Sequence, residues 1–203
     1  MKFYEKYPEI LSLQTEVKDK KYKNNISKVY IDQSIFMPSS GILLDDYKTA
    51  AGFEVIDVRE NRGTTIVSLK GKVDSPKIDL LVDKKLRYRN LYYNTAYILF
   101  QIFLEAFYGK IKTKLYLSED KAFISLLNYR SDIDPDLFDE MINYAIDSNL
   151  PIKSEAGISE VLGLGTVINS YINFDNTYKI RNFKIIDIRK EGKNTIIGFV
   201  AGR

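Results

Sequence analysis

The chain has 203 residues, 45% of them hydrophobic and 28% charged, with a net charge of +3. That length can hold one large domain or two small ones, and the apolar share is sufficient for a buried core. With no cysteine and no histidine, the chain lacks disulfides, thiol nucleophiles, Ser-His or Cys-His catalytic pairs and the usual zinc ligands.

The sequence has no apolar segment of the length that crosses a bilayer, and its start, MKFYEKYPEI, carries charges where a signal peptide needs apolar residues. A cytoplasmic protein without membrane association is therefore expected. The mild excess of positive charge permits nucleic-acid binding, but it is also typical of a solvated lysine-rich surface.

The first part of the chain shows the alternation of apolar and polar residues that predicts strands. These strands are expected at 10–17, 27–36, 53–58, 65–69 and 77–82. A lysine-rich turn is expected at 18–25, and the segment 38–41 (PSSG) predicts a loop. No helical period occurs before residue 80, so a small closed or nearly closed β-barrel is the economical way to hide the strand edges.

A long helix is expected close behind Asp83, in the stretch 87–109, and the predicted domains are 1–84 and 85–203. Its apolar stripe recurs at three- and four-residue steps. The stripe consists of Leu91, Thr95, Ile98, Leu99, Ile102, Phe103 and Ala106. Gly109 stops this helix, and a second helix is expected from Asp134-Pro135 to Asn149.

Two hairpins complete the predicted second domain, one at 112–117 and 122–127, the other at 183–188 and 195–200. The expected fold class is α+β: an N-terminal small β-barrel domain followed by a two-layer α+β domain with helices packed on an antiparallel sheet.

Several motifs in this order resemble those of the alanyl-tRNA editing proteins, the free-standing relatives of the editing domain of alanyl-tRNA synthetase. The segment VYIDQSIFMPSSG is similar to the family's strand and glycine-rich loop, and NTAYI stands where the family has His-Thr-Ala-x-His. The segment NSYINFDNTYKIRNFKI is similar to the family's last motif, Cys-Gly-Gly-Thr-His and its continuation. The resemblance covers nearly the whole chain.

The departures from the family pattern fall on its chemistry. In this register the four zinc ligands correspond to Asn94, Ile98, Asn169 and Asn173, none of which is a plausible zinc ligand. No metal and no cofactor are therefore expected. The resemblance implies a substrate pocket, whose candidate residues are Asn94, Thr95, Asn169, Asn173, Ser40 and Gly41.

Two interpretations of these residues stay open. The three asparagines either hydrogen-bond an aminoacyl ester or a water molecule, or they are satisfied polar residues in a relic cavity. Thr95 either lies beside the aminoacyl group, as the resemblance implies, or bonds back to its own helix.

Basic residues flank the predicted long helix and the last motif. They form either a phosphate-contacting rim or a solvated surface. The nucleic-acid-binding candidates are Arg87, Arg89, Lys110, Lys112, Lys179 and Arg181, with Lys114 and Lys184 beside them.

The resemblance implies tRNA as partner and binding of its aminoacylated end, with zinc-independent deacylation of mischarged alanine tRNA as the possible activity. No catalytic residue is identified, because the available carboxylates, such as Asp45 and Asp46, are typical turn and surface residues. The alternative is a catalytically inactive scaffold that binds RNA, a small ligand or a protein. A homodimer through an exposed barrel edge is a further expectation.

Overall fold

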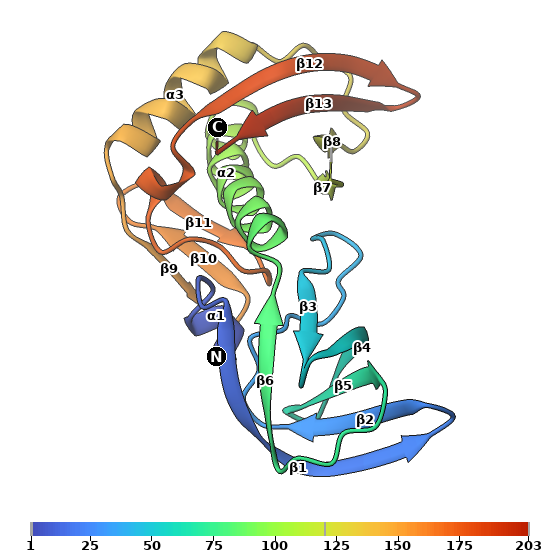
Figure 1. Cartoon of the computed structure of the whole chain (residues 1–203). Helices are drawn as coiled ribbons and strands as arrows, with labels where there is room; N and C mark the ends of the chain where they lie inside the picture. Colours follow the sequence, from blue (N-terminus) through green and yellow to red (C-terminus); the bar gives the residue numbers. More distant parts are fainter. Residues whose placement is uncertain (1, 120, 203) are drawn as a thin grey trace. The chain divides into compact units, whose positions relative to one another are not determined.

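The computed structural model describes residues 2–119 and 121–202 and has an α+β fold with mostly antiparallel sheets. Within these residues there are three α-helices and one short 3-10 helix, η1. The chain divides into two compact units, Met1–Tyr88 and Arg89–Arg203, which are described separately (Figure 1). None of the described helices is long and apolar enough to cross a membrane.

Unit 1 (Met1–Tyr88) contains a closed six-stranded barrel with the strand order β1-β2-β5-β4-β3-β6. Its strands are β1 Ser12–Lys23, β2 Ile26–Ile31, β3 Tyr47–Ala50, β4 Phe53–Asn61, β5 Thr64–Lys70 and β6 Lys77–Val82. Alternate residues point inward, and Val29, Val67 and Leu80 are fully buried in the core. The predicted barrel is confirmed. Because it is closed, the homodimer expectation loses the free barrel edge on which it was based.

Several local expectations for unit 1 were wrong, among them the strand predicted at 27–36, which ends at Ile31 as β2. The lysine-rich segment 18–25 belongs mostly to β1, and the turn is reduced to Asn24 and Asn25, which have φ of 52° and 60°. Two residues with positive φ make a tight hairpin turn. The lysines are compatible with a strand because the side chains of 18–23 are exposed to solvent. β3 (Tyr47–Ala50) and the single-turn helix α1 (Phe3–Lys6) were also missed, since four residues carry little periodicity.

The long helix α2 (Lys84–Tyr108) starts in unit 1 and continues in unit 2 (Arg89–Arg203). The Asp83 carboxylate accepts from the backbone N–H of Leu86 at 3.0 Å and so caps the helix. Gly109, at φ 78°, ends it as predicted. Residues 93–100 are buried without a break, so the middle of α2 is buried on all sides rather than along one stripe, whereas Ala106 is exposed.

Unit 2 builds one four-stranded sheet in the order β12-β13-β8-β7. Its strands are β7 Thr113–Leu117, β8 Ala122–Leu126, β12 Phe183–Glu191 and β13 Asn194–Ala201. Helix α3 (Pro135–Asp147) is capped as predicted, because Asp134 Oδ1 accepts from the N–H of Asp136 at 3.0 Å. The ring of Phe138 on α3 stacks on Phe100 of α2 at 4.6 Å between centroids.

A second sheet in unit 2 was not predicted. Strands β9 (Ile152–Glu155), β10 (Ile158–Val161) and β11 (Gly165–Ile168) pair in the order β11-β10-β9, and η1 (Thr177–Ile180) follows them. Four-residue strands show too little alternation to be recognised in sequence. This sheet nevertheless carries part of the candidate site.

Candidate functional site

Three asparagines assigned to ligand positions by the resemblance meet in unit 2. The side-chain amide of Asn94 donates to Asn169 Oδ1 at 3.3 Å and to the carbonyl of Ile172 at 2.9 Å. Asn169 donates in turn to Asn173 Oδ1 at 3.4 Å, and Asn173 donates to the carbonyl of Phe174 at 2.7 Å. The predicted set is therefore brought together by a chain of hydrogen bonds.

Two serines that were not predicted extend this arrangement. Ser154 on β9 and Ser159 on β10 are paired residues, and their hydroxyls share a hydrogen bond of 2.8 Å. Ser154 donates to Asn173 Oδ1 at 2.9 Å, and Ser159 accepts from the Asn169 amide at 3.2 Å. We call Asn94, Asn169, Asn173, Ser154 and Ser159 the amide cluster. No signal in the sequence marked these serines, because nothing indicated the pairing of β9 with β10.

The amide cluster is closed and uncharged. Asn94 is 0% exposed, Asn169 6% and Asn173 7%, whereas Ser154 is half-buried. Buried amides need partners, and most of these polar atoms have them. Asn94 Oδ1 is the exception: it is buried and finds no hydrogen-bond partner among the described residues. The cluster can thus accept one further hydrogen bond at the side chain of Asn94.

The Thr95 hydroxyl forms two hydrogen bonds. It donates to the carbonyl of Leu91, one turn earlier, at 2.6 Å and accepts from the backbone N–H of Phe174 at 3.0 Å. The first bond is the local one that threonines in helices commonly form. The second ties α2 to the segment that carries Asn173, so Thr95 holds the amide cluster in place from the neighbouring position.

The amide cluster does not fit zinc. Zinc takes thiolate, imidazole or carboxylate ligands, and the cluster offers only amide and hydroxyl groups. The fourth position, Ile98, is a fully buried aliphatic side chain. Within the described residues no group of three or more acidic, histidine or cysteine residues is placed to hold a metal ion.

Ser40 and Gly41, the remaining pocket candidates, lie in a loop of unit 1. The Ser40 hydroxyl accepts from the N–H groups of Ile42 at 3.2 Å and Leu43 at 3.0 Å, so it stabilises its own turn. Gly41 adopts φ 67° at that turn, which explains the glycine. Leu43, whose N–H takes part in this turn, is buried.

Arg87 was wrongly placed among the candidate phosphate contacts. Its side chain is 0% exposed and forms a bidentate pair with Asp46, through Nε to Oδ2 at 2.5 Å and Nη2 to Oδ1 at 3.1 Å. It also donates to the carbonyls of Pro8 at 2.9 Å and Ile35 at 2.6 Å. All of these residues lie in unit 1, and a guanidinium so enclosed cannot reach a phosphate.

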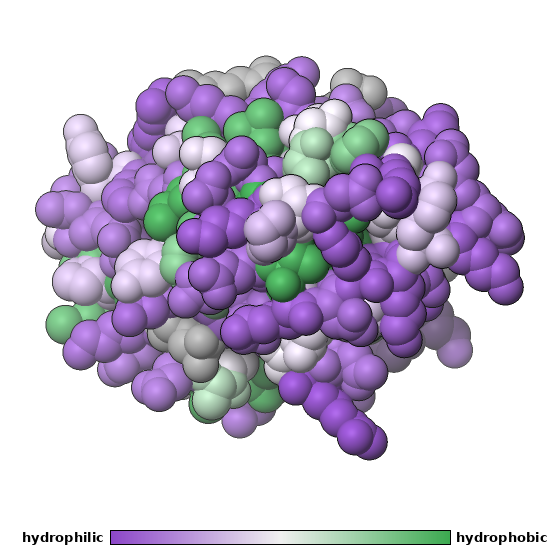
Figure 2. Space-filling model, turned by 60° about the horizontal axis from the view of Figure 1, so that its bottom comes forward, coloured by the Kyte–Doolittle hydropathy of each residue, from purple (hydrophilic) through white to green (hydrophobic). Residues whose placement is uncertain are grey.

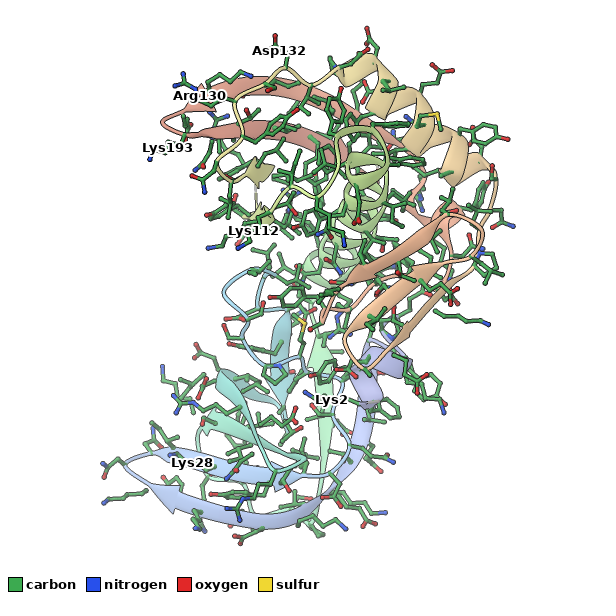
Figure 3. The ribbon with its side chains drawn as sticks, turned by 180° about the vertical axis from the view of Figure 1, so that it is seen from behind. Lys2, Lys28, Lys112, Arg130, Asp132 and Lys193 are labelled. Carbon is green, nitrogen blue, oxygen red and sulfur yellow. The ribbon has the colours of Figure 1, made fainter. Side chains whose placement is uncertain are left out.

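The other basic candidates differ in availability. The Arg89 guanidinium lies 4.5 Å from the ring of Tyr93 and donates to the carbonyl of Ser118 at 2.7 Å, and Lys179 pairs with Asp175 at 2.9 Å. Three candidates remain exposed: Lys110, Lys112 and Arg181. Lys112 is exposed and directly precedes β7 (Figure 3).

No family model matches the chain, and no curated protein matches it closely enough to identify a relative.

Proposed function

We propose that this chain is a metal-free relative of the alanyl-tRNA editing proteins and that it binds the aminoacylated end of tRNA. One observation carries the proposal. The resemblance assigned Asn94, Asn169 and Asn173 to one site, and these residues, with Asn94 and Asn169 separated by 75 positions in sequence, lie within hydrogen-bonding reach. An arbitrary register would not be expected to select side chains that meet.

The chemistry of the amide cluster suits recognition of a polar, uncharged or cationic group. An aminoacyl ester offers an ammonium donor and a carbonyl acceptor. Asn94 Oδ1 supplies a free acceptor, and half-buried Ser154 lies where the cluster approaches solvent. A ligand that bonds to Asn94 must displace part of the existing network, so the expected binding combines new hydrogen bonds with the loss of old ones.

Zinc-independent deacylation is the second candidate function. It is supported by the unpaired acceptor Asn94 Oδ1, because a water molecule bound to this atom would be positioned near a bound ester. The amide cluster has no group that changes protonation near neutral pH, so catalysis would depend on positioning and oriented dipoles alone. Binding without rapid hydrolysis is therefore the better supported activity.

The closed network also supports a third possibility, an inactive scaffold that binds RNA, a small ligand or a protein. In that case the amide cluster serves only to connect α2 to the segment 169–173. The tRNA proposal places the chain in the cytoplasm, where charged tRNA is found.

The direct test compares binding of alanine tRNA carrying serine with the same tRNA uncharged, in a filter assay at two salt concentrations. The proposal predicts preference for the charged form of about tenfold, equivalent to about 1.4 kcal/mol. The preference should shrink in Ser154→Ala and persist in Ser12→Ala, an exposed serine outside the cluster. Equal affinity for both forms would contradict the proposal.

Hydrolysis is measured separately, with serine and glycine on alanine tRNA, in the presence and absence of a chelator. Deacylation above background that survives chelation supports the second candidate. Deacylation that the chelator abolishes would contradict a metal-free site.

A further inference from the structure

The outer face of the barrel in unit 1 carries a group of lysines on three neighbouring strands. Lys21 on β1 lies directly opposite Lys28 on β2, and Ile26 on β2 lies between Lys23 on β1 and Lys70 on β5. On β2, Ser27 and Val29 point into the barrel and are exposed by only 2% and 0%. Because successive strand residues point to opposite faces, Lys28 between them points outward. We call Lys21, Lys23, Lys28 and Lys70 the lysine face.

The pairing of Lys21 with Lys28 has an energetic cost. Directly opposed side chains on antiparallel strands lie about 5 Å apart at Cβ, and like charges in that position destabilise the sheet. Lys21 is also 5.7 Å from the ring of Tyr30, a cation–π contact that partly compensates. A polyanion bound across both amino groups would turn this repulsion into attraction.

Among the described carboxylates, only Glu54 forms an ion pair with a member of the lysine face, Lys70. This ion pair spans 3.7 Å. Asp57, on the same side of the sheet, forms an ion pair with Arg59 at 2.7 Å. Asp19 lies on β1 and accepts from the backbone N–H of Lys20 at 2.8 Å. In the described part of the chain, no ion pair is formed by Lys21, Lys23 or Lys28.

The surroundings of the lysine face are hydrophilic. Figure 2 shows a face of the molecule on which polar residues predominate, with small hydrophobic areas between them, and 18–23 of β1 are all exposed polar or tyrosine residues. Lys28 is marked on β2 in Figure 3. A face of this composition fits a charged, hydrated partner better than an apolar protein surface.

We propose that the lysine face binds the phosphate backbone of RNA. Lysines about 5 Å apart across strands and about 7 Å apart along a strand can contact successive phosphates. The contacts would be independent of sequence and would hold the RNA without reading it. The identification of the polyanion as RNA rests on the proposed function, whereas the position of the binding surface rests on the barrel alone.

The test uses the full-length variant Lys21→Gln/Lys23→Gln/Lys28→Gln and a control with the same loss of charge, Lys48→Gln/Lys84→Gln/Lys153→Gln. The control lysines are exposed and form no ion pair with any other described residue. Affinity for uncharged tRNA is measured between 50 and 200 mM salt. At the lower salt concentration the lysine-face variant should bind tRNA at least about tenfold more weakly than the wild type. Its slope of log K against log salt should be less steep by about 2–3. The control variant should match the wild type in both quantities.

A tRNA that lacks its 3′-terminal nucleotides separates this inference from the proposed function. If the lysine face binds RNA, the truncated tRNA still distinguishes the two variants, even if charged and uncharged tRNA bind equally. Equal tRNA binding by the two variants would overturn the inference. So would binding of vesicles containing anionic phosphatidylserine that depends on the lysine face while tRNA does not bind.

Discussion

Two buried polar arrangements hold α2 to distant parts of the chain, and they do so in opposite ways. In unit 1, Arg87 is joined to Asp46 by a bidentate ion pair and donates to two further carbonyls. In unit 2, Asn94 is joined to Asn169 and Ile172 by uncharged hydrogen bonds and keeps one acceptor free. The first arrangement is completed by its own partners, whereas the second has capacity for one more.

This difference indicates that the Arg87–Asp46 pair has a structural role only, a role that we call a structural lock, whereas the amide cluster is a candidate binding site. A buried ion pair must be completely partnered, because each unpaired charge in the interior costs several kcal/mol. A cluster of amides and hydroxyls tolerates an unfilled position at a lower cost. The amide cluster can therefore exchange partners with a ligand, and the Arg87–Asp46 pair cannot.

The largest expected effect is on the ion pair. Arg87→Met should lower the free energy of unfolding by about 3–5 kcal/mol, because it leaves the Asp46 carboxylate buried without its cation. Urea unfolding measures the loss. The double variant Arg87→Met/Asp46→Leu should recover much of it, because it removes both charges. A loss below about 1 kcal/mol in Arg87→Met would show that the pair is not a structural lock.

A smaller loss is expected in the amide cluster. Asn94→Ala removes the donor to Ile172 and Asn169 and should cost about 1–3 kcal/mol in urea unfolding. Asn61→Ala, at an exposed strand end, should stay within about 0.5 kcal/mol of the wild type. Equal stability of the two variants would mean that the cluster contributes nothing to holding α2.

Thr95 should have a local effect. Thr95→Val keeps the shape of the side chain but removes the acceptor of the Phe174 N–H, so exchange of that amide hydrogen should become about tenfold faster. Thr95→Ser keeps the hydroxyl and should leave the exchange rate close to the wild type. Identical rates in the two variants would show that the hydrogen bond does not protect this segment.

The smallest expected effect concerns pH. The chain has no histidine and no cysteine, so few groups change protonation between pH 6 and 8. The free energy of unfolding should vary by less than about 0.5 kcal/mol over this interval, as measured by urea unfolding at each pH. A steeper change would contradict this expectation, because it would require a carboxylate or amine whose pKa differs between the folded and unfolded chain in this interval.

The sequence predicted the elements that have a strong hydrophobic periodicity or clear capping and turn residues at their ends. The long helix with its stop at Gly109, the cap at Asp134 and the closing hairpin were all found, as was the barrel. The strands β3, β9, β10 and β11 were missed, because each has four residues and hardly any pattern.

The candidate site was predicted in part for a different reason. Asn94, Asn169 and Asn173 were found only through the resemblance, since no local pattern connects residues so far apart. Ser154 and Ser159 depend on a strand pairing that was not foreseen. Arg87 was misjudged because a lone arginine is usually exposed, and its partner Asp46, 41 positions away, could not be identified from sequence.

We propose that the amide cluster occupies the position that the zinc site has in the alanyl-tRNA editing proteins, and a variant that rebuilds the zinc ligands tests this correspondence. The variant Asn94→His/Ile98→His/Asn169→Cys/Asn173→His restores the family's ligand types at the assigned positions. Titration of the folded variant with cobalt should give the d–d absorption of one tetrahedral ion per chain, and zinc should displace it. A folded variant that binds neither ion would contradict the correspondence between the amide cluster and the editing-domain metal site.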